Sequence, residues 1–184
     1  MTATQNPAPA VIRPGTEPGD LGMVTLLHGR LYAAEHGMDQ TMEAYVARGL
    51  GEFAAARARD DSAGRLWVVE AGGRVVGSIG VTDAGNGRAQ LRWFLLDSAQ
   101  RGRGLGARLM ATALAYGRDR GFTGLFLWTI AGLDPAHQLY RAAGFTLTES
   151  RPVHQWGRDV LEQRFDLLLD VAATAGTRCE PAAR

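Results

Sequence analysis

The residues best suited to binding chemistry lie in a glycine- and arginine-rich loop in the middle of the chain. Gly102, Gly104 and Gly106 alternate there with Arg101 and Arg103, after an apolar stretch and before a helical pattern. Glycines let a ligand approach the backbone, and the N–H groups and positive dipole end of a helix start attract phosphate. Arginines add charge-assisted hydrogen bonds. The loop therefore predicts a pyrophosphate site, and a turn that merely starts a helix is the competing interpretation.

The spacing of the glycines separates this loop from two common phosphate-binding motifs. A P-loop needs Gly-Lys followed by Ser or Thr, a combination that the sequence lacks. The dinucleotide fingerprint needs Gly-x-Gly-x-x-Gly, whereas the third glycine here, Gly106, comes one residue early. Both motifs are therefore set aside.

Hydrophobic spacing predicts the elements that position this loop. Asp20 and Asp134 are expected to cap their helices. The loop between the two final strands is expected to hold Arg151, His154 and Trp156, with Trp156 covering a bound acceptor. The pattern indicates strands at 11–13, 66–70, 75–81, 90–96, 125–129, 145–149 and 160–169, and helices at 21–36, 40–59, 104–121 and 135–143.

This element order predicts an α/β fold. The sheet should be mixed and mostly antiparallel, with a meander in the first half and helices on its flanks. A central βαβ crossover should run from Leu95 and Leu96 through the long helix to Leu125. The glycine-rich loop would then lie at the end of a strand, where the crossover helix begins.

Composition narrows the class of protein. The 184 residues fit one domain, expected at 11–169 between flexible segments at 1–10 and 170–184. A formal net charge of +1 argues against nucleic acid and an anionic membrane as partners. The one cysteine, Cys179, can form neither an internal disulfide nor a zinc site, and no signal peptide is recognised. These features are typical of a cytoplasmic protein.

Two motifs in the expected order resemble those of the GNAT acetyltransferases. Arg101-x-x-Gly104-x-Gly106 after an apolar strand resembles the acyl-CoA motif of that family. The segment 136–145, with Ala, Leu-Tyr and Gly-Phe at its spacing, resembles the second motif, and the overall resemblance covers 11–169. A further likeness to GNAT domains fused to MarR-type regulators rests on Gly19-Asp20-Leu21-Gly22, His28-Gly29, Leu31-Tyr32 and His154.

The resemblance implies acetyl-CoA as co-substrate and assigns residues to it. The strand at 94–96 should splay from its parallel neighbour at 125–129, so that the pantetheine arm enters the gap and a backbone N–H holds the thioester carbonyl. Backbone amides of 101–107 should hold the pyrophosphate. The implied cofactor-binding residues are Phe94, Leu95, Leu96, Arg101, Gly102, Arg103, Gly104, Leu105, Gly106 and Ala107.

Tyr140 is the residue that the resemblance places beside the sulfur, as the group that protonates the leaving thiolate. A phenol with a pKa of about 10 is protonated at neutral pH and can act as a donor. The competing interpretation is an aromatic side chain that fills the core beside Leu139. One departure from the family is Leu133, where many members have an asparagine, and this puts one pantetheine or water contact in doubt.

The group that accepts the proton of the amine is less marked in the sequence. The stretch 91–96 contains no acidic residue. Candidates are Glu35, His36 and Asp39 after the first helix, and His154 in the last loop, each of which could also be an ordinary surface residue. His154 is preferred as the second catalytic residue, because in this family the loop before the last strand often lines the acceptor cleft.

The sequence thus predicts an N-acetyltransferase that moves the acetyl group from acetyl-CoA to a primary amine by direct attack in a ternary complex. Neither a nucleophilic cysteine nor a Ser-His pair suggests a covalent acyl-enzyme, and no metal site is expected. The alternative is a non-catalytic acyl-CoA-binding regulatory module on the same fold. The acceptor could be a small molecule or a peptide, and the protein could form a homodimer.

Overall fold

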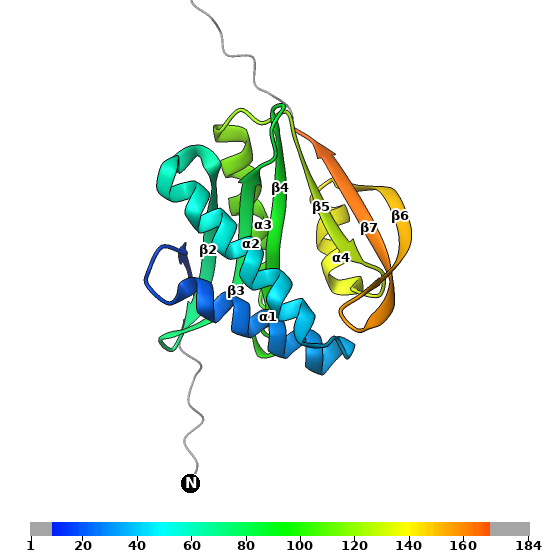
Figure 1. Ribbon diagram of the computed structural model, residues 1–184. Helices are drawn as coiled ribbons and strands as arrows, with labels where there is room; N and C mark the ends of the chain where they lie inside the picture. The colour runs from blue at the N-terminus through cyan, green and yellow to red at the C-terminus, as the bar shows by residue number, and fades with distance from the viewer. Residues whose placement is uncertain (1–8, 170–184) are drawn as a thin grey trace, which may run out of the picture.

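The computed structural model describes residues 9–169, which form one seven-stranded sheet with helices on both faces (Figure 1). The predicted flexible segments lie outside the described residues apart from Pro9 and Ala10, and so does Cys179. In chain order the elements are β1 (Val11–Pro14), α1 (Asp20–His36), α2 (Gln40–Arg59), β2 (Gly64–Ala71), β3 (Arg74–Asp83), β4 (Arg88–Leu96), α3 (Leu105–Asp119), β5 (Gly124–Ile130), α4 (Asp134–Ala142), β6 (Thr146–Gln155) and β7 (Arg158–Leu168).

The sheet has the order β1-β2-β3-β4-β5-β7-β6, and every neighbouring pair is antiparallel except β4 and β5. This confirms the predicted mixed sheet with one crossover, which passes through α3. The parallel pairing covers only Arg88, Ala89 and Gln90, opposite Gly124 to Phe126. Beyond Gln90 the two strands diverge, as Figure 1 shows, so the predicted splay is present.

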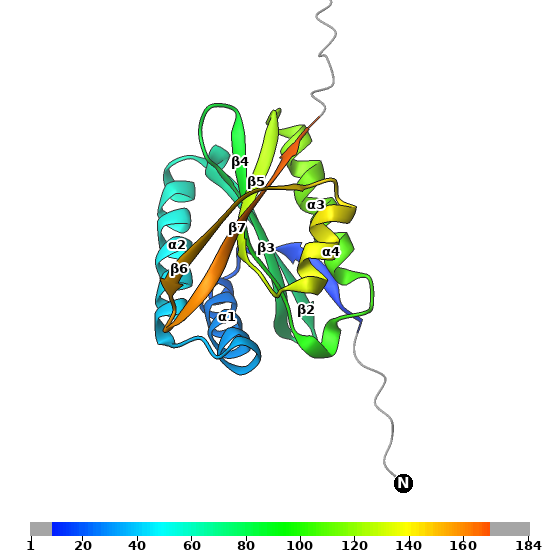
Figure 2. The same ribbon diagram turned by 90° about the vertical axis from the view of Figure 1, so that its right-hand side faces the viewer.

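The helices form two layers (Figure 2). Helices α1 and α2 cover one face of the sheet, where Val46, Leu50 and Val68 are fully buried. Helices α3 and α4 cover the other face, where Leu109 and Phe165 are fully buried. Removal of apolar surface from water stabilises both layers at about 25 cal/mol per Å².

A β-bulge bends β4 where it leaves β5. Trp93 has a φ of 50°, in the left-handed region that non-glycine residues rarely adopt, and the register with β3 shifts between Ser78 and Gly80. The buried Ser78 hydroxyl donates a hydrogen bond of 2.6 Å to the Trp93 carbonyl and so stabilises the bulge. Bulges of this kind change the direction of a strand and of its side chains.

The structure corrects the predicted last loop. Arg151 and His154 belong to β6, and only Trp156 and Gly157 separate this strand from β7. Nearly every β6 residue is exposed, so the strand lacks the alternation of apolar and polar residues by which the sequence would reveal it. Its place in the sheet rests on backbone pairing with β7 from Thr146 to Gln155.

Two predicted helix caps are also wrong. Gly19 is the N-cap of α1, and Asp20 is the buried first residue of that helix, which accepts hydrogen bonds from the Arg13 guanidinium and the Glu17 N–H. Leu133 is the N-cap of α4, and Asp134 follows it without a side-chain capping bond. Within the described part of the chain, no helix is both long and apolar enough to cross a membrane.

Candidate functional site

The loop between β4 and α3 presents backbone donors at the start of a long helix. Gly104 is the N-cap of α3 with a φ of 76°, and no side chain caps this end. In the described part of the chain, the N–H groups of Leu105, Gly106 and Ala107 find no acceptor, because the first bond of the helix runs from Arg108 to the Gly104 carbonyl. A Cβ atom on Gly104 would meet nothing within 4 Å. The helix start is therefore open to an anion.

Gly106 has a different role in the same turn. A Cβ atom there would lie 2.8 Å from Cδ1 of Leu139 on α4. The missing side chain therefore allows α4 to pack closely against the start of α3. Gly106 is thus required for helix packing, whereas Gly104 leaves the start of the helix open.

A groove of about 650 Å³ runs from this loop along the end of β4 toward α4 and the end of α1. Eight of the ten predicted cofactor-binding residues line it. Of the other two, Arg103 donates a hydrogen bond of 2.7 Å to Gln100, and Leu105, the first residue of α3, is buried in the core. The lining residues from the prediction are Phe94, Leu95, Leu96, Arg101, Gly102, Gly104, Gly106 and Ala107.

Arg101 links the loop to α1 at the edge of the groove. Its Nη2 atom lies 2.9 Å from each carboxylate oxygen of Glu35, and its Nε donates to the Leu96 carbonyl at 3.0 Å. Glu35, one of the predicted base candidates, is therefore engaged in an ion pair. His36 lies beside it, 3.8 Å from the same carboxylate, and burial lowers the pKa of this histidine.

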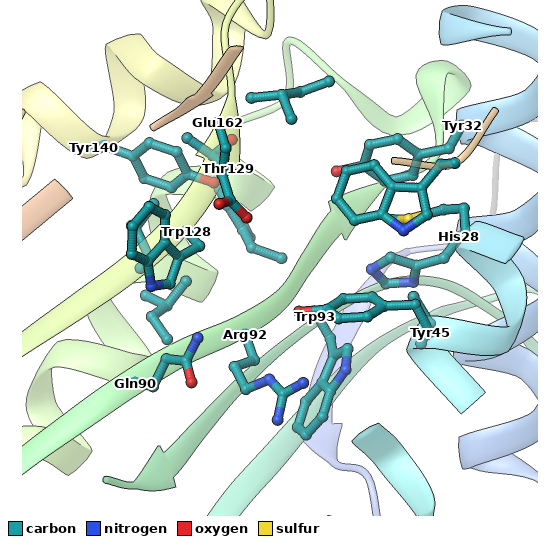
Figure 3. A pocket seen from close by; sticks show the side chains of 17 residues that line it. His28, Tyr32, Tyr45, Gln90, Arg92, Trp93, Trp128, Thr129, Tyr140 and Glu162 are labelled. Carbon is teal, nitrogen blue, oxygen red and sulfur yellow. The ribbon is translucent and has the colours of Figure 1, made fainter. Parts of the chain in front are cut away.

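A second, smaller cavity of about 100 Å³, here called the inner pocket, opens on the α1 and α2 side of the sheet (Figure 3). It lies where β4 and β5 diverge, and Trp156 in the β6–β7 turn contributes to its wall. Tyr32, Phe94 and Tyr140 line both this pocket and the groove. The two cavities therefore meet at these three side chains, in the gap between the strands.

Tyr140 lies at this junction and is 5% exposed. Its ring packs against Phe94, Phe145 and Phe165, so this side chain belongs to the core as well as to the lining of the groove. Burial raises the pKa of Tyr140, the neighbouring Tyr32 raises it further, and a hydrogen bond with the Thr129 side chain acts in the opposite direction. The phenol is therefore protonated at neutral pH, so it can donate a proton but cannot act as a base.

Tyr32 on α1 faces the same junction, and sequence reasoning assigned it no chemistry. Burial raises its pKa to about 12, with the Glu35 carboxylate adding to the rise and Arg101 opposing it. His28, one turn earlier, is buried and bonded to the Val24 carbonyl through Nδ1 at 2.8 Å. Burial lowers its pKa to about 4, so this histidine is neutral at physiological pH.

The remaining base candidates, Asp39 and His154, line neither the groove nor the inner pocket. The His154 side chain is 71% exposed on β6, with Nδ1 2.8 Å from the Asp159 carboxylate, and it lines neither the groove nor the inner pocket. Asp39 caps α2 by accepting a hydrogen bond of 2.9 Å from the Thr41 N–H. The structure thus brings Tyr140 and the loop together but places His154 elsewhere.

Glu162 is the acidic residue that lines the inner pocket. It lies on β7 opposite Ile130 of β5, and its side chain is 13% exposed. Arg151 from β6 donates to one of its carboxylate oxygens through Nε at 2.8 Å. The Arg151 guanidinium in turn lies over the Trp128 ring at 4.6 Å. Only the pairing of β7 with β5 brings Glu162 to the pocket, and no local sequence spacing indicates it.

Comparison with known proteins gives a family match over the segment that contains the groove. The sequence model of the acetyltransferase (GNAT) family matches residues 31–145, more than half of the chain. Rat N-acetyltransferase 8 is 39% identical over 93 residues, which are 48% of this chain and 42% of that protein. Human N-acetyltransferase 8B is 32% identical over 98 residues, 50% of this chain and 43% of that protein. The chain therefore spans less than half the length of the curated relatives that it matches.

Solved structures share the fold over most of the chain. Ribosomal-protein-alanine N-acetyltransferase from Brucella melitensis matches with a TM-score of 0.70 and 21% identity, covering 86% of this chain and 99% of that one. The protein yncA from Salmonella typhimurium, solved with its cofactor acetyl-CoA, matches with a TM-score of 0.70 and 20% identity, covering 89% and 96%. At these identities the likeness establishes the fold.

Proposed function

Because the chain belongs to the acetyltransferase (GNAT) family, we propose that it transfers the acetyl group of acetyl-CoA to an amine held in the inner pocket. The observation that carries this proposal is the junction of the two cavities at Tyr32, Phe94 and Tyr140. A thioester at the end of the groove would there face an amine in the inner pocket. Close placement of two reactants in this way lowers the entropic part of the barrier.

The groove has the features that coenzyme A requires. The open N–H groups at the start of α3 and the bare Gly104 suit a pyrophosphate. The end of β4, beyond Gln90, has no β5 partner and leaves backbone groups of Phe94 to Leu96 for the pantetheine amides. A backbone N–H of the same strand would hold the thioester carbonyl as negative charge develops on its oxygen.

The reaction is a direct displacement. The amine nitrogen forms a bond to the acetyl carbon, the bond from that carbon to sulfur breaks, and the sulfur leaves with the bonding electrons. One proton leaves the nitrogen and one reaches the sulfur. Tyr140 donates toward the sulfur, since its burial keeps the phenol protonated. The one cysteine of the sequence is Cys179, which favours a mechanism without an acyl-enzyme.

Glu162 is our proposal for the group that takes the proton from the amine, directly or through water. It carries a carboxylate into the inner pocket, whereas His154, the residue preferred from the sequence, points to solvent. Arg151 holds the Glu162 carboxylate in place from the side. One experiment can test both Glu162 and His154 as the group that accepts this proton.

The finer features of the prediction stay proposals. These are a primary amine on a small molecule or peptide as acceptor, a homodimeric assembly, a cytoplasmic location, and the likeness to GNAT domains fused to MarR-type regulators. A purely regulatory acyl-CoA-binding module would bind acetyl-CoA but release no free coenzyme A when amines are added.

The test is coenzyme A release over a panel of amines, measured for the wild-type protein and for Glu162→Gln and His154→Gln. We expect amine-dependent release by the wild type, about 10²-fold lower kcat in Glu162→Gln, and near wild-type kcat in His154→Gln. Gln keeps the shape and one acceptor for Arg151, so the fold should persist. If His154→Gln lost kcat and Glu162→Gln kept it, His154 would be the group that accepts the proton. If no amine caused release of coenzyme A, the result would support the regulatory module.

A further inference from the structure

The inner pocket contains an arginine that the proposed reaction does not use. Arg92 extends from β4 on the same side as Gln90, and both side chains line the pocket (Figure 3). The Arg92 guanidinium lies over the Trp93 ring at 4.6 Å. Among residues 9–169, none forms a hydrogen bond or an ion pair with it, whereas Arg88 on the same strand pairs with Asp166. A guanidinium has five donors and no acceptor, so this group is open to an anion.

The surroundings hold Arg92 in a defined place. The bulge at Trp93 puts this indole on the same side of β4 as Arg92, although the two residues are adjacent in sequence. Helix α2 passes over the pair at Gly49, where a Cβ atom would lie 2.6 Å from the Arg92 Nη2 atom. Position 49 must therefore lack a side chain for the guanidinium to keep this position. The donors of Arg92 are thus oriented before any ligand arrives.

The charge balance of the pocket favours a negative group on the ligand. Glu162 is already paired with Arg151, and His28 is neutral at physiological pH. Arg92 therefore carries a positive charge that no side chain among residues 9–169 offsets by pairing with it. A polyamine would bring further positive charge against it, and like charges in a half-buried pocket repel each other.

The walls of the pocket add a second requirement. Tyr45, Trp93, Trp128 and Trp156 contribute aromatic surface from α2, β4, β5 and the β6–β7 turn. Tyr45 and Trp156 contact each other edge to face with centroids 5.6 Å apart, which joins α2 to the turn. Flat apolar walls of this kind stabilise an apolar or aromatic portion of a ligand.

We propose that Arg92 determines specificity, by binding a carboxylate on an acceptor that has a primary amine and an aromatic or apolar side group, as an aromatic amino acid has. The amine would then point toward the junction at Tyr140, and the side group would lie among the indoles. This inference rests on the proposed acetyl transfer, because it concerns the acceptor of that reaction.

The experiment compares acceptors that differ only in the carboxylate. Phenylalanine and phenethylamine share the amine and the ring, and coenzyme A release gives kcat/KM for each. Their acetylated products are titrated in parallel against the protein with coenzyme A present, with tryptophan fluorescence as the readout. The variants are Arg92→Gln and, as a matched control, Arg48→Gln, which removes an equal charge from an Arg whose side chain is 72% exposed on α2.

We expect the wild type and Arg48→Gln to prefer the carboxylate-bearing partner by about 10- to 100-fold, the range of a charge-assisted hydrogen bond. Arg92→Gln should lose this preference while its values for phenethylamine and its product stay within about threefold. Equal affinity of the wild type for the two products, or no binding of either, would overturn the proposal. Product binding with the expected preference but no coenzyme A release would instead contradict the proposed function alone.

Discussion

At the scale of single residues, Tyr140 belongs both to the core and to the proposed reaction site. Its ring is packed among three phenylalanines, and the residue lines both the groove and the inner pocket. The two interpretations of this residue from the sequence, donor and core filler, therefore describe two ends of one side chain. Removal of the hydroxyl alone separates the two roles.

Tyr140→Phe should lower kcat by about 10²-fold while acetyl-CoA affinity and Tm stay close to wild type. A positioned general acid contributes about 10²–10⁴-fold. The lower end is expected, because burial raises the pKa of Tyr140 and makes full transfer of its proton to a thiolate less favourable. Steady-state kinetics, calorimetry with acetyl-CoA and thermal unfolding measure the three quantities.

The control for this substitution is Tyr116→Phe. Tyr116 lies on α3 with its ring against Trp67 and lines neither cavity, so the same loss of a hydroxyl should leave kcat unchanged. If Tyr140→Phe kept more than about half of the wild-type kcat, the phenol would be structural, and the proton would reach the sulfur from water or another group.

His28 should make the stability of the fold depend on pH. Its folded pKa of about 4 lies below the value near 6.5 expected in the unfolded chain. Between these two values the unfolded chain binds more protons, so the free energy of unfolding falls as pH falls through this window. From pH 7 to pH 5 the loss from this residue should be about 2 kcal/mol.

Urea unfolding of the wild type and His28→Gln at pH 7 and pH 5 isolates this contribution. The variant should be less stable at pH 7 but should lose about 2 kcal/mol less between the two pH values. Carboxylates with lowered pKa, such as Asp166, lose their stabilising effect only at lower pH and so contribute little to this difference. If the wild type and His28→Gln lost the same free energy of unfolding between pH 7 and pH 5, folding would not lower the pKa of His28.

Site residues that belong to a local sequence motif could be predicted from the sequence. Site residues that reach the pocket only through strand pairing or a bulge could not. Gly104 and Tyr140 belong to motifs of fixed spacing, and both line the groove. Glu162 and Arg92 reach the inner pocket through strand pairing and through a bulge, neither of which leaves a local pattern. His154 was expected in a loop, whereas its strand directs it to solvent.

At the scale of elements, the start of α3 is the feature that the proposed cofactor site depends on most. Within the described residues no side chain caps this helix, so its first N–H groups lack an acceptor there, and Gly104 has no side chain to cover them. The helix dipole adds a partial positive charge at the same place. A negative side chain at this position would therefore compete with a phosphate.

Gly104→Asp should weaken acetyl-CoA binding by at least about 10²-fold, since like charges in contact cost several kcal/mol. Gly121→Asp is the matched control, because Gly121 has a φ of 73° against 76° for Gly104, and a Cβ atom at either position meets nothing within 4 Å. Both variants therefore carry similar backbone strain and the same charge. Calorimetry that gave equal affinities for the two variants would contradict the phosphate site.

The sequence predicted the order of all eleven main elements and missed details at their ends. Strands with apolar residues facing a helix layer were recognised, and α2 has the predicted bounds Gln40–Arg59. The polar edge strand β6 was predicted too short, because its pairing with β7 needs no apolar side chain. The cap predicted at Asp20 is wrong because this carboxylate pairs with Arg13 of β1, and the structure gives no corresponding reason for Asp134.

At the scale of the whole molecule, the divergence of β4 and β5 makes the two cavities possible. The parallel pair holds together for three residues and then opens, so that a groove from the α3 side and a pocket from the α2 side meet between the strands. A continuous sheet would separate these two spaces. The proposal of acetyl transfer within one ternary complex rests on this meeting point.

The most direct test of that claim is the initial rate of coenzyme A release with acetyl-CoA and an accepted amine both varied. The sequence contains no lysine, so acetylation of lysine side chains of the protein cannot contribute to the signal. Direct transfer predicts reciprocal plots that intersect, because both substrates must be bound together before the sulfur leaves. Parallel lines would instead indicate an acetylated protein intermediate, and release that does not depend on the amine would contradict acetyl transfer.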